Sequence, residues 1–158
     1  MQGSERSNRL LIATDGSPGS LAAAEEGVRL AKLLGAGVTF VGVAHAPLRV
    51  LGDPYYQRAL GKNLGAMRAA LAKSTPYAVE RHVEYETELL EGSPAKVVLD
   101  LARSRDVDLI VVGSRGLGPT KGALLGSVSS EIVQRADRPV LVARPVDRRT
   151  GRSTRIAV

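Results

Sequence analysis

The sequence predicts an α/β fold, in which helices cover both faces of a five-stranded parallel sheet within a single domain. Five short apolar runs with strand character alternate with four runs whose apolar residues recur at helical spacing. Most of the strand runs are apolar on both faces, as expected for strands buried between two helical layers. Strands and helices in alternation favour a parallel sheet with right-handed crossovers.

The first strand is expected over residues 10–13, and it ends at the polar turn 14–16. Ser17 is suited to cap the helix that follows, and Pro18 then occupies the first helical position, where a missing N–H does no harm. This helix is expected to stop near Gly35, since glycine suits a left-handed C-cap. The second strand is expected over residues 38–44.

A long second helix is predicted by apolar residues three or four positions apart, despite glycines at 61 and 65. These apolar residues are Tyr56, Leu60, Leu64, Met67 and Leu71.

The third strand has a different pattern, because charged and less polar residues alternate in it. His82, Glu84, Glu86 and Glu88 alternate with Val83, Tyr85, Thr87 and Leu89. A period of two with one charged face predicts a half-exposed strand at the edge of the sheet. Ser93 and Pro94 then repeat the start of the first helix, and a third helix is expected from there.

Residues 109–112 predict a fourth strand that is buried on both faces and ends at Gly113. A fourth helix is expected to begin after Gly126, because Val128, Ile132 and Ala136 recur at helical spacing. Residues 140–143 contain no polar side chain and predict the fifth strand.

Length and composition limit the classes of protein to consider. A chain of 158 residues suits one domain, expected over residues 1–145. Five arginines and one aspartate lie in residues 144–158, so much of the net charge of +6 belongs to a basic tail, 146–158, expected to be flexible. There is no cysteine for a disulfide or thiol chemistry, and the 3% aromatic content argues against nucleic-acid recognition by stacking. With no membrane-spanning stretch, a cytoplasmic protein without membrane contact is expected.

The passage from the fourth strand to the fourth helix has the features of an anion site. Gly113, Gly116 and Gly126 would let the main chain approach phosphate oxygens and adopt positive φ angles, and the helix begins with N–H groups that lack partners. Ser127 and Ser129 would add hydroxyl donors. The alternative is that the glycines make a tight turn and that Ser127 merely caps a helix.

A family resemblance becomes specific at these residues. Gly113-Ser-Arg-Gly116, nine further residues, then Gly126-Ser127 resembles the Gly-x-x-Gly, nine residues, Gly-Ser/Thr signature of the nucleotide-binding branch of the universal stress protein family. Residues 10–20, 91–102 and 138–144 also resemble segments of that family. Residues 47–77 have no recognisable counterpart.

The resemblance implies a Rossmann-like sheet, of the kind found in adenine nucleotide alpha hydrolases, with strand order 3-2-1-4-5. That order reverses the chain between the first and fourth strands, and open α/β sheets bind ligands at such a switch point. Asp15 and Gly113 would both lie there.

The resemblance also implies a set of ligand contacts to ATP, ADP or AMP. Ala13, Thr14 and Asp15 would border the base and ribose, and Val43 would offer its backbone to the adenine edge. The ribose and phosphates would lie against Gly113, Ser114, Arg115, Gly116, Gly126, Ser127, Val128 and Ser129. Mg²⁺ commonly bridges nucleotide phosphates, although no all-protein metal cage is evident. Read alone, Asp15 suits a ribose contact, a metal contact or an Asx-turn.

The fifth strand would form the other edge of the sheet, yet it carries no charge to block pairing. An unprotected apolar edge usually has a partner. A twofold homodimer paired through residues 140–143 is therefore expected, as the resemblance also implies. A covering by the basic tail is the alternative.

No catalytic residue is predicted. The chain lacks a Walker loop and a Gly-x-Ser-x-Gly elbow, and its histidines at 45 and 82 have no evident nucleophile beside them. Lys121 in the glycine loop would reach a terminal phosphate or remain a surface lysine. The leading interpretation is an adenine-nucleotide-binding regulatory protein of the stress response. An adenine-nucleotide hydrolase with slow turnover and a nucleotide-free interaction module remain as alternatives.

Overall fold

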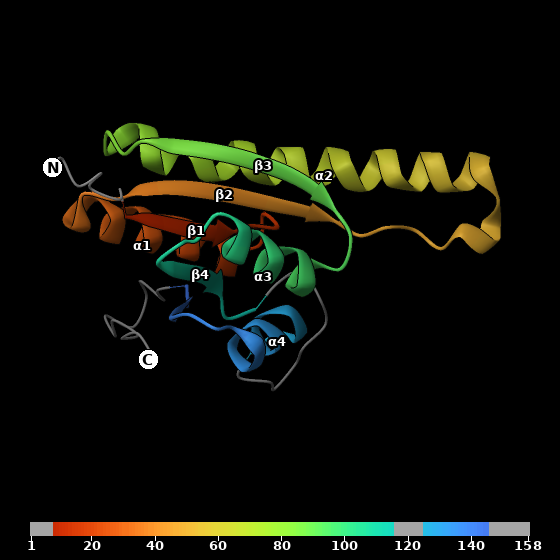
Figure 1. Cartoon of the computed structure of the whole chain (residues 1–158). Helices are drawn as coiled ribbons and strands as arrows, with labels where there is room; N and C mark the ends of the chain where they lie inside the picture. The colour runs from red at the N-terminus through yellow and green to blue at the C-terminus, as the bar shows by residue number, and fades with distance from the viewer. Residues whose placement is uncertain (1–7, 116–124, 146–158) are drawn as a thin grey trace, which may run out of the picture.

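The computed structural model describes residues 8–115 and 125–145. The predicted tail, Gly116 and Lys121 lie outside these ranges. The elements in chain order are β1 (Arg9–Ala13), α1 (Pro18–Leu34), β2 (Gly37–Ala44), the short 3₁₀ helix η1 (Arg49–Leu51), α2 (Asp53–Glu80), β3 (Tyr85–Glu91), α3 (Pro94–Ser104), β4 (Leu109–Gly113), α4 (Ser127–Arg135) and β5 (Val140–Ala143). Five strands alternate with four α-helices, as the sequence predicted (Figure 1).

The five strands form one parallel sheet in the order β3-β2-β1-β4-β5. Strand β1 lies at the centre, where Leu11 is in register with Thr39 of β2 on one side and Ile110 of β4 on the other. The predicted order is therefore confirmed. The chain reverses its direction of progress between β1 and β4, so the carboxyl ends of these two strands border a switch point.

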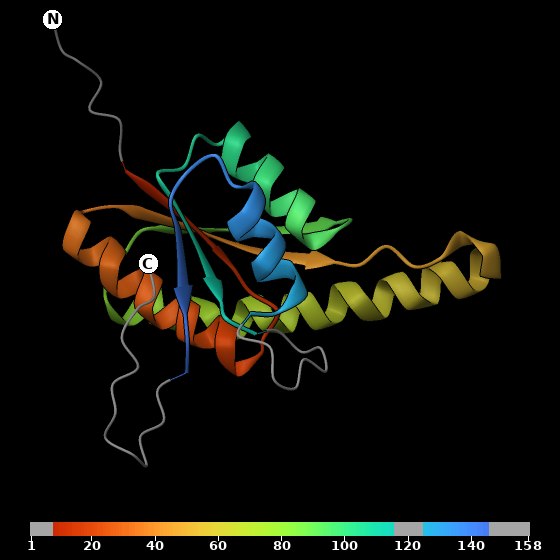
Figure 2. The ribbon, with the colours of Figure 1, turned by 90° about the horizontal axis from the view of Figure 1, so that it is seen from below.

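Alternate residues of each strand contribute to two apolar cores, one on each face of the sheet. Figure 2 shows α1 and α2 on one face and α3 and α4 on the other. Leu10, Ile12 and Phe40 pack with α1 and α2, whereas Leu11, Val41 and Ile110 pack with α3 and α4. All six side chains are buried. The fold thus has three layers, with aliphatic residues on both sides of the central strands, which is why those strands lack a polar face.

The ends of α1 form as the sequence predicted. The Ser17 hydroxyl accepts a hydrogen bond from the Ser20 amide at 3.2 Å, and Pro18 is the first helical residue. Gly35 takes the left-handed conformation, with φ of 61°, and ends the helix. Ser93 precedes Pro94 in the same way, but its side chain makes no capping hydrogen bond to α3.

Strand β3 is an exposed edge, as predicted, but it begins later than expected. His82 does not lie on the strand. It has a φ of 53° and belongs to the turn that closes α2, where its N–H donates to the carbonyl of Val79. The charged face begins within the strand itself, and Glu86 there pairs with Arg9 at 2.7 Å. The alternation of charged and less polar residues begins in this turn, so it predicted a strand start that is too early.

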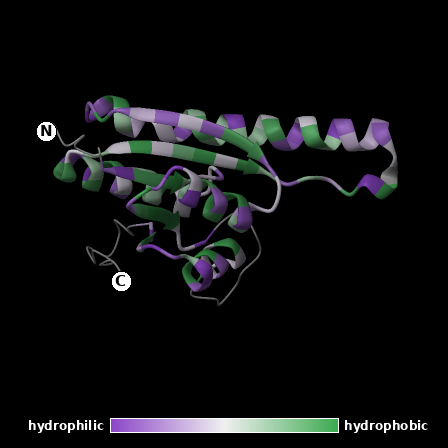
Figure 3. Ribbon diagram, viewed as in Figure 1, coloured by the Kyte–Doolittle hydropathy of each residue, from purple (hydrophilic) through white to green (hydrophobic). Residues whose placement is uncertain are grey.

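Helix α2 is 28 residues long, and its first half projects beyond the sheet (Figures 1 and 2). Between Tyr56 and Ala70 none of its residues is buried, and this part displays hydrophilic and hydrophobic bands side by side (Figure 3). Its second half runs through Pro76 and packs on the sheet through buried Leu71 and Ala78. Neither α2 nor any other described helix is apolar enough over a sufficient length to cross a membrane.

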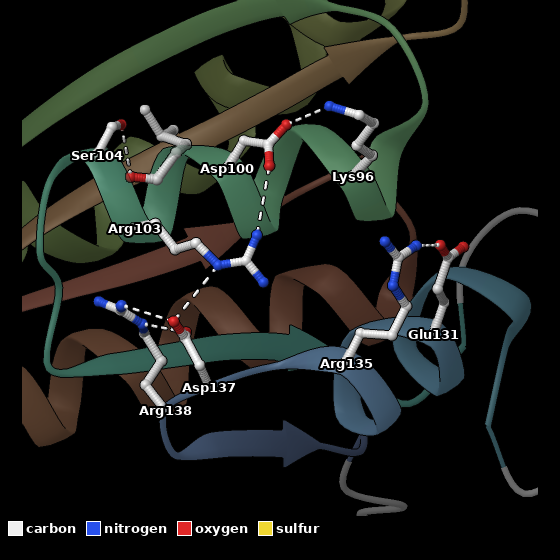
Figure 4. A network of polar contacts seen from close by, with 9 residues as sticks. Lys96, Asp100, Arg103, Ser104, Glu131, Arg135, Asp137 and Arg138 are labelled. Carbon is white, nitrogen blue, oxygen red and sulfur yellow. Dashed lines mark hydrogen bonds and ion pairs between the residues drawn. The ribbon is translucent and has the colours of Figure 1, made fainter.

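Arg138 precedes β5 and joins it to α3 and to the segment before β4. Figure 4 shows Arg138 beside Asp137, with Arg103 of α3 on the other side of the same carboxylate. The Arg138 side chain is only 15% exposed, and one guanidinium nitrogen donates to the carbonyls of Ala102 at 2.9 Å and Val107 at 2.8 Å. The guanidinium also pairs with Asp137 at 2.9 Å, which lowers the pKa of that carboxyl from 3.8 to about 2. Arg103 of α3 lies against the same carboxylate at 3.4 Å.

Replacing this guanidinium should destabilise the fold. Arg138→Met leaves the carbonyl of Val107 without its guanidinium donor, whereas the carbonyl of Ala102 keeps the amide of Val107 at 3.1 Å. We expect the free energy of unfolding in urea to fall by about 1.5–3 kcal/mol at neutral pH. The pKa of Asp137 is lower in the folded state, so its ionised form stabilises the fold. This stabilisation is complete above about pH 4 and is lost as the pH falls through about 2. The difference in the free energy of unfolding between Arg138→Met and the wild type should therefore become smaller in acid.

Arg135 provides the matched control, because it makes an exposed ion pair with Glu131 one turn away. Arg135→Met should change the free energy of unfolding by less than about 0.5 kcal/mol. Equal effects of the two substitutions would contradict the role assigned to Arg138.

Candidate functional site

A cavity of about 310 Å³ opens at the carboxyl ends of β1 and β4, at the predicted switch point. A volume of this size suits a small organic ligand. The cavity is lined by Ala13, Thr14, Asp15, Ser17, Ser20, Val41, Val43, His45, Met67, Pro94, Val98, Val112, Gly113, Arg115, Gly126, Ser127, Val128 and Ser129.

One side of the cavity is apolar. Val41 and Val43 come from β2, Val112 from β4 and Val98 from α3, and all four side chains are at least nine-tenths buried. Met67 of α2 adds a flexible thioether to the lining from the other face of β2, where it lies against Gly42. A flat, weakly polar ring would lose water there without leaving a charge unpaired.

Three helices begin at the cavity. Ser17 precedes α1, Pro94 opens α3 and Ser127 opens α4, and each of the three lines the cavity. Helix N-termini carry partial positive charge, so their convergence favours an anionic ligand. Arg115 adds a full positive charge to the lining and Asp15 a negative one.

Helix α4 has the amides that are available to such an anion. Its first N–H groups have no carbonyl partner within the helix, and no side chain among the described residues caps them. Gly126 is the N-cap residue, so Ser127 is the first helical residue rather than the cap that was one alternative. The first turn of α4 therefore presents bare backbone donors to the cavity.

Ser129 stabilises this helix start through its hydroxyl. Its hydroxyl lies 3.0 Å from the carbonyl oxygen of Gly126 and 3.2 Å from that of Ser114. The Ser114 carbonyl also accepts from the Gly126 amide at 2.7 Å. The hydroxyl donor that the sequence predicted at Ser129 is thus already occupied by the backbone. Ser114 is itself buried behind the cavity and does not line it.

Gly113 lacks a side chain for a reason that the sequence did not indicate. A Cβ at this position would lie within 2.7 Å of three backbone atoms in Gly19 and Ser20, in the first turn of α1. Gly113 does not have a positive φ, and Gly126 has a φ of −72°. The predicted left-handed conformation is therefore wrong at both, and Gly113 serves the close packing of β4 against α1.

Asp15 and Thr14 adopt local structures of their own. A carboxylate oxygen of Asp15 accepts from the Ser17 amide at 2.9 Å, which is the Asx-turn that the sequence left open. The Thr14 hydroxyl lies 2.9 Å from that of Ser74 in α2 and 3.3 Å from that of Ser20 in α1. These buried hydroxyls connect the end of β1 to both helices on that face.

Ten of the twelve predicted contact residues line the cavity; Ser114 lies behind it and Gly116 lies outside the described ranges. The sequence missed Ser17, Ser20, Val41, His45, Met67, Pro94, Val98 and Val112 as lining residues. His45 was detectable, because it directly follows β2, whose carboxyl end borders the same edge of the sheet. Met67 was not detectable from the sequence, because only the path of α2 in the folded structure brings it to the cavity.

A metal site is not evident in the described ranges. No group of three or more His, Cys, Asp or Glu side chains gathers there in a way that would hold an ion. The cavity lining contains a single carboxylate, that of Asp15, and the imidazole of His45.

The fold is a doubly wound α/β sheet with a cavity at its switch point, and comparison with known proteins gives the family. The family model described as "Universal stress protein family" matches residues 7–144. A universal stress protein of Thermus aquaticus is 34% identical over 135 residues, covering 85% of this chain and 97% of that protein. The chain belongs to the universal stress protein family.

Solved structures agree with this. Universal stress protein UspA from Lactobacillus plantarum superposes with a TM-score of 0.79 at 25% identity, covering 89% of this chain and all of that one. A universal stress protein in complex with cAMP has a TM-score of 0.65 at 24% identity, covering 89% of this chain and 98% of that one. An Arabidopsis thaliana family protein with AMP bound has a TM-score of 0.67 at 20% identity, covering 90% of this chain and 95% of that one. The last two likenesses establish a shared fold.

The contact between Gly113 and α1 yields a stability prediction. Gly113→Ala should lower the free energy of unfolding in urea by about 1–3 kcal/mol, because its methyl group meets the backbone of α1 rather than a side chain that can move. Gly65→Ala is the control, since a Cβ there meets nothing within 4 Å in the middle of α2. It should raise the free energy of unfolding by about 0.5–1 kcal/mol. Unchanged stability of Gly113→Ala would remove the packing role.

Proposed function

We propose that this protein binds ATP or a related adenine nucleotide, ADP or AMP, in the cavity at the switch point. The proposal rests on one observation, that the same cavity has an apolar wall on one side and the start of a helix on another. Val41, Val43 and Val98 form the wall, and the first turn of α4 offers uncapped backbone donors. A purine suits the wall and a phosphate suits the donors.

The remaining predicted contacts follow from this division. Ala13, Thr14 and Asp15 end β1 beside the apolar wall, where a base and ribose would lie. Gly113, Arg115 and the residues that open α4 lie at the end that would hold phosphates. Family members with cAMP, dAMP and AMP support an adenine nucleotide as the ligand class. Mg²⁺ would enter with the nucleotide phosphates, since the lining offers one carboxylate.

We propose a regulatory role in the stress response, in which binding rather than turnover is the function. The imidazole of His45 and the carboxylate of Asp15 share the cavity lining, but the latter already accepts the amide that shapes its own turn. A nucleotide that favours one arrangement of the cavity surface would shift the population seen by a partner. Rapid multiple-turnover phosphate release would instead favour the hydrolase alternative.

We also propose a homodimer paired through β5. Within the described residues β5 pairs with β4 alone, and Val140, Leu141 and Val142 are partly exposed. The carbonyl of Pro139 accepts a hydrogen bond from Ile110 of β4, and that of Ala143 accepts one from Ser114, which directly follows β4. Because backbone groups alternate in direction along a strand, those of Val142 point toward the open edge. An apolar edge of this kind suits pairing with its own copy.

A charge at the start of α4 should separate nucleotide binding from folding. Ser127 is exposed as the first residue of α4, so Ser127→Asp places a carboxylate where a phosphate would bind. A carboxylate also interacts favourably with a helix N-terminus, so the fold should be retained. We expect the calorimetric Kd for ATP to rise at least about tenfold, which corresponds to about 1.4 kcal/mol.

Ser127→Asn is the matched control, because it has nearly the same shape without the charge, and its ATP affinity should stay near that of wild type. Adenosine, which lacks phosphate, should bind both variants equally. Equal ATP affinity of Ser127→Asp and wild type would contradict the phosphate site.

Removing one outward amide should test the dimer. Val142→Pro deletes the N–H that faces the open edge of β5, and proline is tolerated on edge strands. Sedimentation should show a dimer for wild type and for Val142→Ile, and a monomer for Val142→Pro with unchanged circular dichroism. A monomeric wild type, or a dimeric proline variant, would contradict pairing through β5.

A further inference from the structure

The projecting arm, residues 45–69, is a feature that the nucleotide site does not explain. It comprises the segment after β2, η1 and the first half of α2, and it extends past the carboxyl edge of the sheet (Figures 1 and 2). Between the buried Tyr56 and Ala70, over residues 57–69 of α2, no side chain is buried. The arm therefore exposes a large surface without adding to either core.

The arm is held in place rather than left loose. The buried Tyr56 donates its hydroxyl proton to Glu91 at the end of β3, at 2.7 Å, and the guanidinium of Arg49 lies 4.8 Å from the centre of the Tyr56 ring. Asn63 donates to the carbonyl of His45 at 2.9 Å. These contacts join η1 and α2 to the sheet, so the tip of the arm has a defined shape.

The arm carries an excess of positive charge without ion pairs. It contains four basic residues, Arg49, Arg58, Lys62 and Arg68, and one acidic residue, Asp53. All four cations are exposed, and none forms an ion pair with another described residue. Elsewhere in the described ranges, most arginines pair with a carboxylate, as Arg9, Arg29 and Arg105 do. The arm thus has more cations than carboxylates, and no described carboxylate pairs with those cations.

Large apolar side chains lie beside these cations. Leu48 is 73% exposed, Val50 86% and Tyr55 65%, and the three are separated by at most eight positions around η1 and the start of α2. Exposed apolar groups gathered at a projection mark an interaction surface.

We propose that the tip of the arm docks on the surface of an anionic lipid bilayer. Leu48, Val50 and Tyr55 would enter the interfacial region, and Arg49 and Arg58 would contact the headgroup phosphates. A duplex nucleic acid would use the charge but leaves the exposed leucine and valine without apolar contact. A second copy of the arm is disfavoured by repulsion between like charges. The absence of a membrane span does not bear on such a contact, since peripheral docking requires none.

The test is sedimentation of the full chain with vesicles of phosphatidylcholine, alone or mixed with phosphatidylglycerol. The wild type should bind the mixed vesicles, bind weakly to phosphatidylcholine alone, and release as salt is raised. Arg58→Glu/Lys62→Glu should weaken binding by at least about tenfold. Leu48→Ser/Val50→Ser keeps the charge and should also weaken it, which a purely electrostatic contact would not predict.

Lys32→Glu/Lys73→Glu is the matched control, because it changes net charge by the same amount at two exposed lysines on α1 and the second half of α2, outside residues 45–69. It should bind the mixed vesicles like the wild type. Circular dichroism and thermal unfolding of each variant should establish that the fold is intact. The proposal is overturned if the wild type does not bind mixed vesicles, if the control loses as much binding as the arm variants, or if Leu48→Ser/Val50→Ser binds normally. Duplex DNA binding that only the charge variant loses, without vesicle binding, would assign the arm to nucleic acid.

Discussion

The approach of two backbones at the carboxyl edge of the sheet is the constraint on which the rest of this structure depends. The end of β4 lies so close to the first turn of α1 that neither strand nor helix has room for a Cβ. A Cβ at Gly113 would collide with the backbone of α1, and a Cβ at Gly19 would collide with the carbonyl oxygen of Arg115. The Ser17 hydroxyl, which caps α1, lies 3.4 Å from that same oxygen. Together these contacts place the start of α1 against the fourth strand and set one wall of the cavity.

The same edge explains why the cavity is polar at one end and apolar at the other. Parallel strands point their carboxyl ends in one direction, so each following helix begins there with donors that have no partner. Where a side chain supplies an acceptor, as Ser17 does for α1, the donor is satisfied. Helix α4 has Gly126 at its N-cap and no such acceptor among the described residues. Its unmet donors lie beside Val112 and Val128, which belong to the core between the sheet and α3.

Helix α2 shows how one element serves two purposes. Its second half buries Leu71, Ser74 and Ala78 against the sheet, and this packing is sufficient to carry the helix past Pro76 to Glu80. Its first half buries nothing between Tyr56 and Ala70 and is held at its far end by the hydrogen bond from Tyr56 to Glu91. The helix therefore supports the site through Met67 while it extends a charged surface beyond it.

The sequence by itself determined the class of fold, the five strands, the caps of α1 and most of the residues that meet at the switch point. The strands and the caps follow from local rules, since apolar runs, Ser-Pro starts and a C-terminal glycine act over a few residues. The strand order and most of the switch-point residues followed from the family resemblance. Only the tertiary structure decided that Gly113 is needed for packing against α1, that the Ser129 hydroxyl is occupied by the backbone, and that His82 lies in a turn. It also brought Met67 and His45 into the cavity. The turn at His82 is set by its hydrogen bond to Val79, close by in the chain, and His45 could have been placed from its position after β2. The packing of Gly113 and the place of Met67 depend on contacts between residues distant in the chain, and no local pattern records such contacts.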